Sequence, residues 1–168
     1  MNATIDEQPK KRPNPILIGA LALSIAAGLV NKFEPGMDQH VVYHDPIATS
    51  RVATVCKGHT GPDVIVGKWY SDEECNTFEV SDLRHAYNAV YRCTYILLTP
   101  EQTGALTDFA LNEGGERLCD STMLRLANAG YLPSVWCQQL MRFNRAGGHV
   151  RRGLIRRRRD EYNLCVLH

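Results

Sequence analysis

The spacing of hydrophobic and polar positions changes along the chain. Residues 16–30, ILIGALALSIAAGLV, carry no charge and predict one helix over about residues 16–34, after a polar, proline-containing tail at residues 1–15. Between residues 37 and 68, the runs HVVYHD, RVATV and DVIVGKWY are short and rich in β-branched and aromatic residues. Gly, Pro and Asp separate these runs, so the segment is predicted to form a small sheet or hairpins.

Two helix-start signals follow this segment. SDEE at residues 71–74 and TPEQ at residues 99–102 have the spacing of a capping box, in which the first and fourth residues bond to each other's backbone amides. They predict a long helix to about Leu98 and another that stops at NEGGE, residues 112–116. Shorter helices are expected at about 120–130 and 134–146, and an arginine-rich helix after Gly153.

These elements predict an α+β fold. A small β-containing lobe near residues 34–70 would be joined by the long helix to a larger helical lobe, with the apolar helix at the N-terminus. A cleft between two such lobes is a natural place for a polymer substrate.

The apolar run at residues 16–30 is short for a membrane span. At about 1.5 Å of rise per residue it covers roughly 22 Å, against about 30 Å for a hydrocarbon core. Three basic residues precede it at positions 10–12 and Lys32 follows it, so the positive-inside rule predicts a cytoplasmic N-terminus and an exported remainder. Two alternatives stay open, a cleaved signal peptide and a buried, alanine-rich core helix.

Charge is distributed unevenly. The formal net charge is +1, yet eight arginines lie between residues 142 and 159, so attraction to anionic partners is expected at that end. The run lacks the interleaved aromatic residues of a nucleic-acid site. A solvated helix face with acidic partners one turn away is the plain alternative.

Six cysteines, with no adjacent pair of C-x-x-C motifs, predict three disulfides made in an oxidising compartment and no metal site. Six buried free thiols are the alternative. Fifteen pairings are possible. We expect Cys119–Cys137, because this bond would join two consecutive short helices, and by elimination Cys56–Cys75 and Cys93–Cys165.

A carboxylate, Glu34, lies just past the apolar run, and Asp45 and Thr54 follow in the predicted sheet. A glycosidase needs one carboxylic acid to protonate the leaving oxygen and a second carboxylate on the other side of the sugar. Glu34 and Asp45 are candidates for such a pair. Other acids of the same region compete with them, namely Asp38, Asp63, Glu73 and Glu74.

Five motifs in register resemble the phage-type lysozyme family, in particular endolysins of lambdoid phages. They are YHDP, TVCKGHTG, the GK and EC pairs at 67–75, CDSTMLRLANAG, and the AGG-to-LC segment at 146–165. The resemblance covers about residues 33–165 and implies a lysozyme-like fold. It also implies hydrolysis of the β-1,4 bonds between N-acetylmuramic acid and N-acetylglucosamine in peptidoglycan.

The resemblance implies that Glu34 is the general acid and that Asp45 and Thr54 position the attacking water. The sequence departs from the family pattern at Pro35 and in a lengthened segment at residues 46–53. One arginine of the last helix, Arg156 or Arg157, is expected to face Glu34, and the sequence leaves the choice between them open.

The resemblance gives His59 a structural role, paired with Asp82 at the start of the long helix, and makes Asn112 a polar residue that lines the cleft. Since carboxyl groups supply both proton transfer and water activation, no metal or cofactor is expected.

Some endolysins of this family carry an uncleaved signal-anchor-release segment, and residues 16–33 resemble one. We therefore expect a tail at 1–15, an anchor at 16–33 and a muramidase domain at 34–168. The enzyme would be held inactive in the host inner membrane, then released to the periplasm to act on glycan strands as a monomer. The alternative is a membrane-tethered, disulfide-stapled cell-wall binding module without catalysis.

Overall fold

The computed structural model describes residues 15–34, 39–44 and 52–167. Predictions for the tail at residues 1–14, for Pro35, for Asp45 and for residues 46–51 lie outside these ranges. The described elements are α1 (Pro15–Phe33), β1 (Gln39–His44), β2 (Ala53–Cys56), β3 (His59–Thr60), α2 (Asp72–Cys93), α3 (Pro100–Glu113), α4 (Gly115–Cys119), α5 (Thr122–Asn128), α6 (Pro133–Trp136), the 3-10 helix η1 (Cys137–Arg142), β4 (Arg145–Ala146), β5 (His149–Val150) and α7 (Arg152–Cys165).

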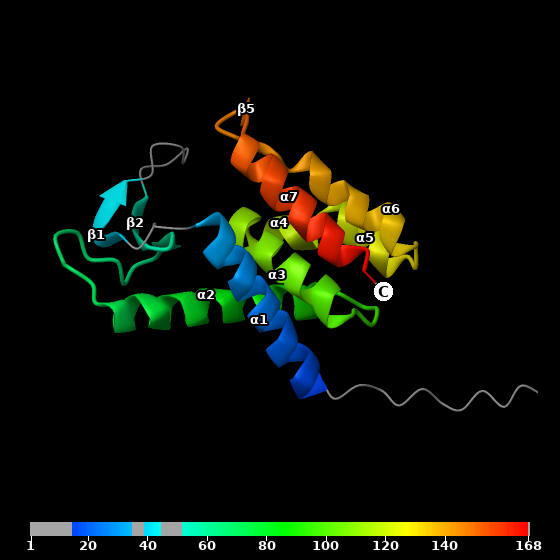
Figure 1. Cartoon of the computed structure of the whole chain (residues 1–168), viewed down its shortest axis with the longest axis horizontal. Coiled ribbons are helices and arrows are strands. Elements are labelled where there is room, and N and C mark those ends of the chain that lie inside the picture. The colour runs from blue at the N-terminus through cyan, green and yellow to red at the C-terminus, as the bar shows by residue number, and fades with distance from the viewer. Residues whose placement is uncertain (1–14, 35–38, 45–51, 168) are drawn as a thin grey trace, which may run out of the picture.

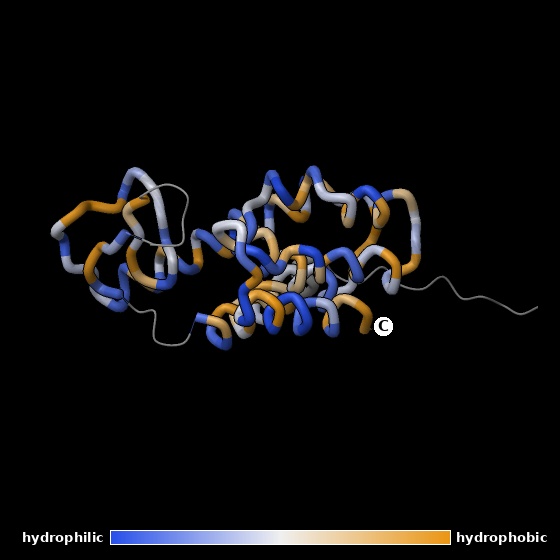
Figure 2. Tube along the Cα trace, turned by 90° about the horizontal axis from the view of Figure 1, so that it is seen from above, coloured by the Kyte–Doolittle hydropathy of each residue, from blue (hydrophilic) through white to orange (hydrophobic). Residues whose placement is uncertain are grey.

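The α+β architecture predicted from the sequence is confirmed. Figure 1 shows the small sheet at one end of the molecule and helices α3 to α7 at the other, with α2 running from beneath the sheet along the helical lobe. In Figure 2, hydrophobic and hydrophilic positions alternate along the outer helices, because these bury one face and expose another. The long helix α2 therefore joins the two lobes.

The β lobe is built on an antiparallel sheet of order β1-β2-β3. Tyr43 pairs with Thr54, and Val55 pairs with His59. Val55 is fully buried in a small core with Cys56, Tyr70 and Cys75. Because side chains alternate along a strand, the burial of Val55 turns its neighbour Thr54 toward the other face of the sheet.

Both predicted capping boxes are present. Ser71 accepts from the amide of Glu74 at the start of α2, and Thr99 accepts from the amide of Gln102 at the start of α3. Helix α2 ends at Cys93, earlier than the predicted Leu98. The side chain of Asn128 donates to the Cys93 carbonyl and accepts from the Tyr95 amide, so a distant residue satisfies the backbone groups at this end.

Helix α3 runs through the middle of the helical lobe, and every residue from Gln102 to Ala110 is buried. Its Leu106 and Phe109 belong to the main core, to which α2, α4, α5, α6, η1 and α7 also contribute. Helices α1, α2 and α7 all pack against α3. Residues near its C-terminal end are thus held within a rigid, close-packed framework.

Helix α1 packs against α3 through its small residues. Ala22 and Ala26 are fully buried, and one further turn brings in Leu29 and Val30. The facing residue on α3 is Gly104, where a Cβ atom would lie 2.7 Å from Ile25 Cγ2 and 3.0 Å from the Ala22 carbonyl oxygen. Glycine at this position therefore allows the two backbones to approach. Of the helices described here, none combines the length and apolarity needed to cross a membrane.

Three disulfides are present, as the cysteine count predicts, and Cys56–Cys75 is one of them. The other two predicted pairs, Cys119–Cys137 and Cys93–Cys165, are wrong. The structure pairs Cys93 with Cys119 and Cys137 with Cys165, with Cα atoms 5.4 Å and 5.9 Å apart. Proximity in sequence misled the prediction, because α4 packs on α2 and η1 packs on α7.

Gly104 is in close contact with α1, whereas Gly28 has open space around it. A change from glycine to alanine should therefore affect stability in opposite directions at the two positions. Gly104→Ala should destabilise the protein by about 1–3 kcal/mol, since α1 must shift to admit the methyl group. Gly28→Ala lies on the exposed face of α1 with nothing within 4 Å of the new Cβ, so it should be neutral or stabilise by up to about 1 kcal/mol. Urea denaturation of both variants measures the difference. Equal stability of the two would contradict the close packing of α1 on α3.

Candidate active site

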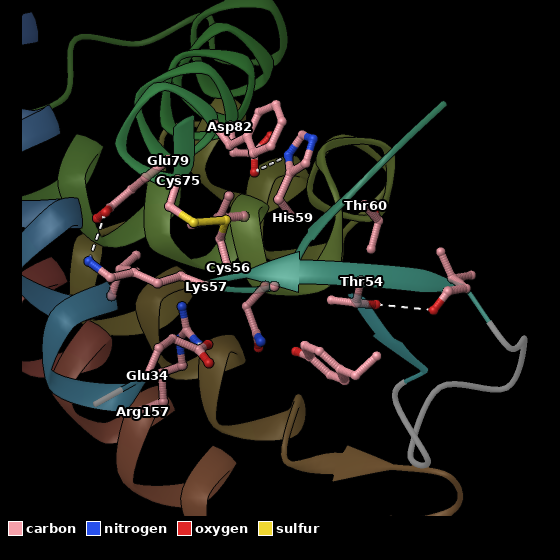
Figure 3. Close-up of a pocket in the computed structure, with 17 residues that line it drawn as sticks. Glu34, Thr54, Cys56, Lys57, His59, Thr60, Cys75, Glu79, Asp82 and Arg157 are labelled. Atoms are coloured by element: carbon pink, nitrogen blue, oxygen red, sulfur yellow. Dashed lines mark hydrogen bonds and ion pairs between the residues drawn. A yellow bond between two sulfur atoms is a disulfide. The ribbon is translucent and has the colours of Figure 1, made fainter. Parts of the chain in front are cut away.

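A cavity of about 340 Å³ lies between the lobes. The end of α1, the sheet, α2, α3 and α7 all contribute to its walls, and Figure 3 shows their side chains converging on it. The lining residues relevant to chemistry are Glu34, Tyr43, Thr54, Lys57, His59, Glu79, Asp82, Asn112 and Arg157.

Glu34 lies at the C-terminal end of α1. Its backbone amide donates to the Val30 carbonyl at 2.8 Å, so it continues the last turn of the helix. Its side chain is 21% exposed and accepts a hydrogen bond of 2.7 Å from Arg157 Nη1. Glu34 is therefore fixed at the cavity wall and still reachable from solvent.

Arg157 is the arginine of α7 that faces Glu34, and the exposed Arg156 does not share this role in the described contacts. Its Nε and Nη2 atoms donate to the two oxygens of Asp108, at 2.9 Å and 2.7 Å, and Asp108 is fully buried on α3. Burial lowers the pKa of Arg157, but the hydrogen bonds and charges of Asp108 and Glu34 outweigh it and raise the pKa above its usual range.

A second layer of charge lies behind this pair. Arg158, also on α7, is fully buried, with its Nη2 atom 2.7 Å from Asn112 Oδ1 and 2.8 Å from Glu161 Oε1. Burial raises the pKa of Glu161 well above its usual range, although the charge of Arg158 opposes this effect. Asn112 is thus held by a buried arginine while it lines the cavity.

The β lobe supplies Thr54, which is 5% exposed and lines the cavity. Its hydroxyl donates to the Val52 carbonyl at 3.1 Å, which leaves the oxygen lone pairs as acceptors. The role of Thr54 in holding water stays a prediction, since its expected partner Asp45 lies outside the described residues.

His59 is held from three sides. Its Nδ1 atom lies 2.9 Å from Asp82, its Nε2 atom lies 3.2 Å from Asp63, and its ring stacks on Phe78 with centroids 3.9 Å apart. Both ring nitrogens are therefore engaged, as expected for a histidine that connects β3 to α2. This geometry leaves neither nitrogen free to act as a base.

Lys57 connects three elements at the edge of the cavity. From the turn after β2, its Nζ atom donates to Asn31 of α1 and to Glu79 of α2, both at 2.8 Å. Lys57 thus ties the end of α1, next to Glu34, to the β lobe. In the described ranges, no group of three or more His, Cys, Asp or Glu side chains is arranged to hold a metal ion.

The sequence did not single out Asp108, Arg158, Glu161 or Lys57. A signal for Asp108 did exist, because a lone carboxylate within the apolar helix sequence GALTDFAL requires a partner if it is buried. The arginine run was treated as one unit, whereas Arg157 and Arg158 point inward and their neighbours Arg156 and Arg159 are exposed.

A two-lobed α+β fold, with a carboxyl group on a helix end facing a small sheet across a cleft, defines a lysozyme-like protein. The chain belongs to the phage lysozyme family, whose family model matches residues 32–161. It is 36% identical over 155 residues to the SAR-endolysin of Escherichia phage Mu, covering 89% of this chain and 90% of that protein.

Solved structures agree with this membership. The muramidase domain of SpmX from Asticaccaulis excentricus superposes with a TM-score of 0.72 at 26% identity, over 85% of this chain and 95% of that domain. The active form of the P1 phage endolysin Lyz superposes with a TM-score of 0.68 at 19% identity, over 88% and 93% of the two chains, and this likeness concerns the fold alone.

Cys56 has a left-handed backbone conformation, with φ of 54°, just before Lys57 and within the cavity wall. An L-residue in this conformation is strained by roughly 1–2 kcal/mol relative to glycine. Two variants that both lack the Cys56–Cys75 bond, Cys56→Gly with Cys75→Ala and Cys56→Ala with Cys75→Ala, should therefore differ in stability. We expect the glycine variant to be more stable by about 1 kcal/mol in thermal unfolding. A more stable alanine variant would contradict the left-handed backbone at this position.

Proposed function

We propose that this protein is an endolysin that hydrolyses the β-1,4 bonds between N-acetylmuramic acid and N-acetylglucosamine in peptidoglycan, with Glu34 as the general acid. The observation that carries the proposal is the position of Glu34, on the wall of the cavity and fixed by Arg157. Membership of the phage lysozyme family and the SAR-endolysin relatives support the same reaction class.

Glycoside hydrolysis in this site needs two events on opposite sides of a sugar ring. Glu34 gives its proton to the leaving glycosidic oxygen, while a water molecule attacks the anomeric carbon from the side of the β lobe. We propose that Thr54 and Asp45 hold that water, and that Asn112 contacts the glycan. A general acid of this kind contributes about 10²- to 10⁴-fold to the rate.

We further propose that residues 16–33 anchor the enzyme in the host inner membrane, with a cytoplasmic N-terminus, before release to the periplasm. While the apolar face of α1 is in lipid, it cannot pack against α3, and Glu34 cannot reach Arg157. Glu34, the first residue of the domain at 34–168, would then be held away from the cavity. The SAR-endolysin relatives support this interpretation, as does the direct attachment of Glu34 to α1.

Glu34→Gln tests the assignment of the acid. The variant keeps the size of the side chain and the contact with Arg157 but carries no transferable proton, so lysis should fall by about 10²-fold or more. A turbidity assay on permeabilised Gram-negative cells measures this. Glu73→Gln, at an exposed position of α2, is the matched control and should lyse cells as the wild type does. Normal lysis by Glu34→Gln would remove Glu34 from the mechanism.

Two exposed positions of α1 test the anchor without disturbing the packed helix. Ser24 and Gly28 lie on its outer face, so leucine at both leaves the contact with α3 intact. Each leucine favours insertion by about 0.3–0.6 kcal/mol, and replacing a polar serine adds to this. Ser24→Leu with Gly28→Leu should therefore remain in the membrane fraction and delay lysis.

The matched control places glutamine at the same two positions, and it should appear in the soluble periplasmic fraction at least as early as the wild type. Purified Ser24→Leu, Gly28→Leu protein should keep the activity of the wild type on isolated peptidoglycan. If the leucine variant were released on the wild-type schedule, residues 16–33 would not act as a reversible anchor.

A further inference from the structure

Arg157 divides its hydrogen bonds unequally between two carboxylates. Two of its nitrogens, Nε and Nη2, donate to Asp108, and Nη1 donates to Glu34. The pair with Asp108 is bidentate and fully buried, whereas Glu34 is 21% exposed. Asp108 is therefore the main partner of the guanidinium, and Glu34 is the second one.

The contact with Arg157 conflicts with the proposed role of Glu34 as a general acid. A guanidinium 2.7 Å from a carboxyl group favours its ionised form, since opposite charges attract strongly at this distance. A general acid must instead keep its proton until the leaving group takes it. Arg157 alone would orient Glu34 well and also oppose its function.

We infer that Asp108 is a positioning residue that offsets the charge of Arg157, so that Arg157 fixes the direction of Glu34 without holding it in the ionised form. The inference rests on the proposed function, in which Glu34 is the acid. Asp108 touches neither Glu34 nor the cavity in the described contacts, and it acts through the arginine.

Several other charged side chains line the two hollows that Glu34 borders, but none of them is an ion-pair partner of Glu34 in the described contacts. On the side of the β lobe, the cavity presents Tyr43, Lys57, His59, Glu79 and Asp82, of which Lys57 binds Glu79 and His59 binds Asp82. On the side of α7, the neighbouring groove presents Lys32, Arg151, Arg156, Arg159 and Asp160, of which Lys32 binds Asp160. Across the described ranges, Arg157 is the cation that forms an ion pair with Glu34.

The buried groups behind Arg157 do not replace Asp108. Glu161 lies 3.9 Å from Arg157 Nε, but its closer contact is Arg158 Nη2 at 2.8 Å. Arg158 in turn contacts Asn112 and Glu113 rather than Glu34. Burial and the neighbouring Asp108 raise the pKa of Glu161 well above its usual range, which favours its neutral form. Asp108 is therefore the carboxylate whose charge offsets that of Arg157.

The test is the pH dependence of peptidoglycan hydrolysis by Asp108→Asn. Asparagine keeps the shape and one acceptor for Arg157 but removes the negative charge, so the full guanidinium charge acts on Glu34. Glu34 then loses its proton at lower pH, and the alkaline limb of the rate profile should move down by about one pH unit. Above that limb the rate should fall about tenfold through kcat, with KM and the rate at acidic pH close to wild type.

Asp120→Asn is the matched control, because it removes the same charge from the end of α4, away from the cavity. Its profile should coincide with that of the wild type. A purely structural role for Asp108 would lower the rate equally at every pH and leave the limb in place, which would overturn the inference.

A double variant, Asp108→Asn with Arg157→Met, removes both charges and leaves no unpaired buried ion. Without the cation, Glu34 should keep its proton to higher pH, so the alkaline limb should lie above that of the wild type even if the rate is lower. This opposite shift decides the matter if Asp108→Asn alone does not fold. A limb at or below the wild-type position would overturn the inference.

Glu34→Gln in the same assay distinguishes a failure of the proposed acid, Glu34, from a failure of the role inferred for Asp108. If Glu34→Gln is active, the proposed acid is wrong. If Glu34→Gln is inactive and the limb of Asp108→Asn does not move, the role of Asp108 alone is wrong.

Discussion

The close packing of α1 on α3 determines where Glu34 lies. A Cβ atom at Gly104 would lie 2.7 Å from the Ile25 side chain and 3.0 Å from the Ala22 carbonyl oxygen, so the depth of α1 depends on glycine at this position. Glu34 continues the last turn of this helix, and Lys57 fixes the same end to the β lobe. The position of the proposed acid therefore depends on the docking of this helix, whose Val30 also lines the cavity.

The same small residues have a second consequence in the proposed anchor. Alanine, glycine and serine lower the hydrophobicity of residues 16–30, so the segment gains less from lipid than a run of leucines of equal length would. In the docked state the buried Ala22 and Ala26 lie on the face that packs against α3, whereas Ser24 and Gly28 are exposed. The alanines thus lower the gain from insertion and also permit the contact with α3, and both effects would favour release.

Sequence patterns that involve a few adjacent residues correctly predicted the secondary structure in which they lie. The two capping boxes, the short strands and the three disulfides follow from a few adjacent residues or from a count. The pairing of Cys93 with Cys119 and of Cys137 with Cys165 could not be predicted in this way, because it depends on which helices pack together. The partner of Asp108 could not be predicted for the same reason, since Arg157 is 49 residues away.

The contact between Asp108 and Arg157 also affects whether the helical lobe can fold before Glu34 reaches the site. Arg157 is 5% exposed, and a buried guanidinium without a partner would strongly destabilise the helical lobe. In the proposed tethered state α1 would be in the membrane and Glu34 would be absent from the site. Arg157 Nε and Nη2 would still donate to Asp108, because both residues belong to the helical lobe. The helical lobe can then fold with Arg157 in place, and release of α1 adds Glu34 to a site that is already charged and oriented to receive it.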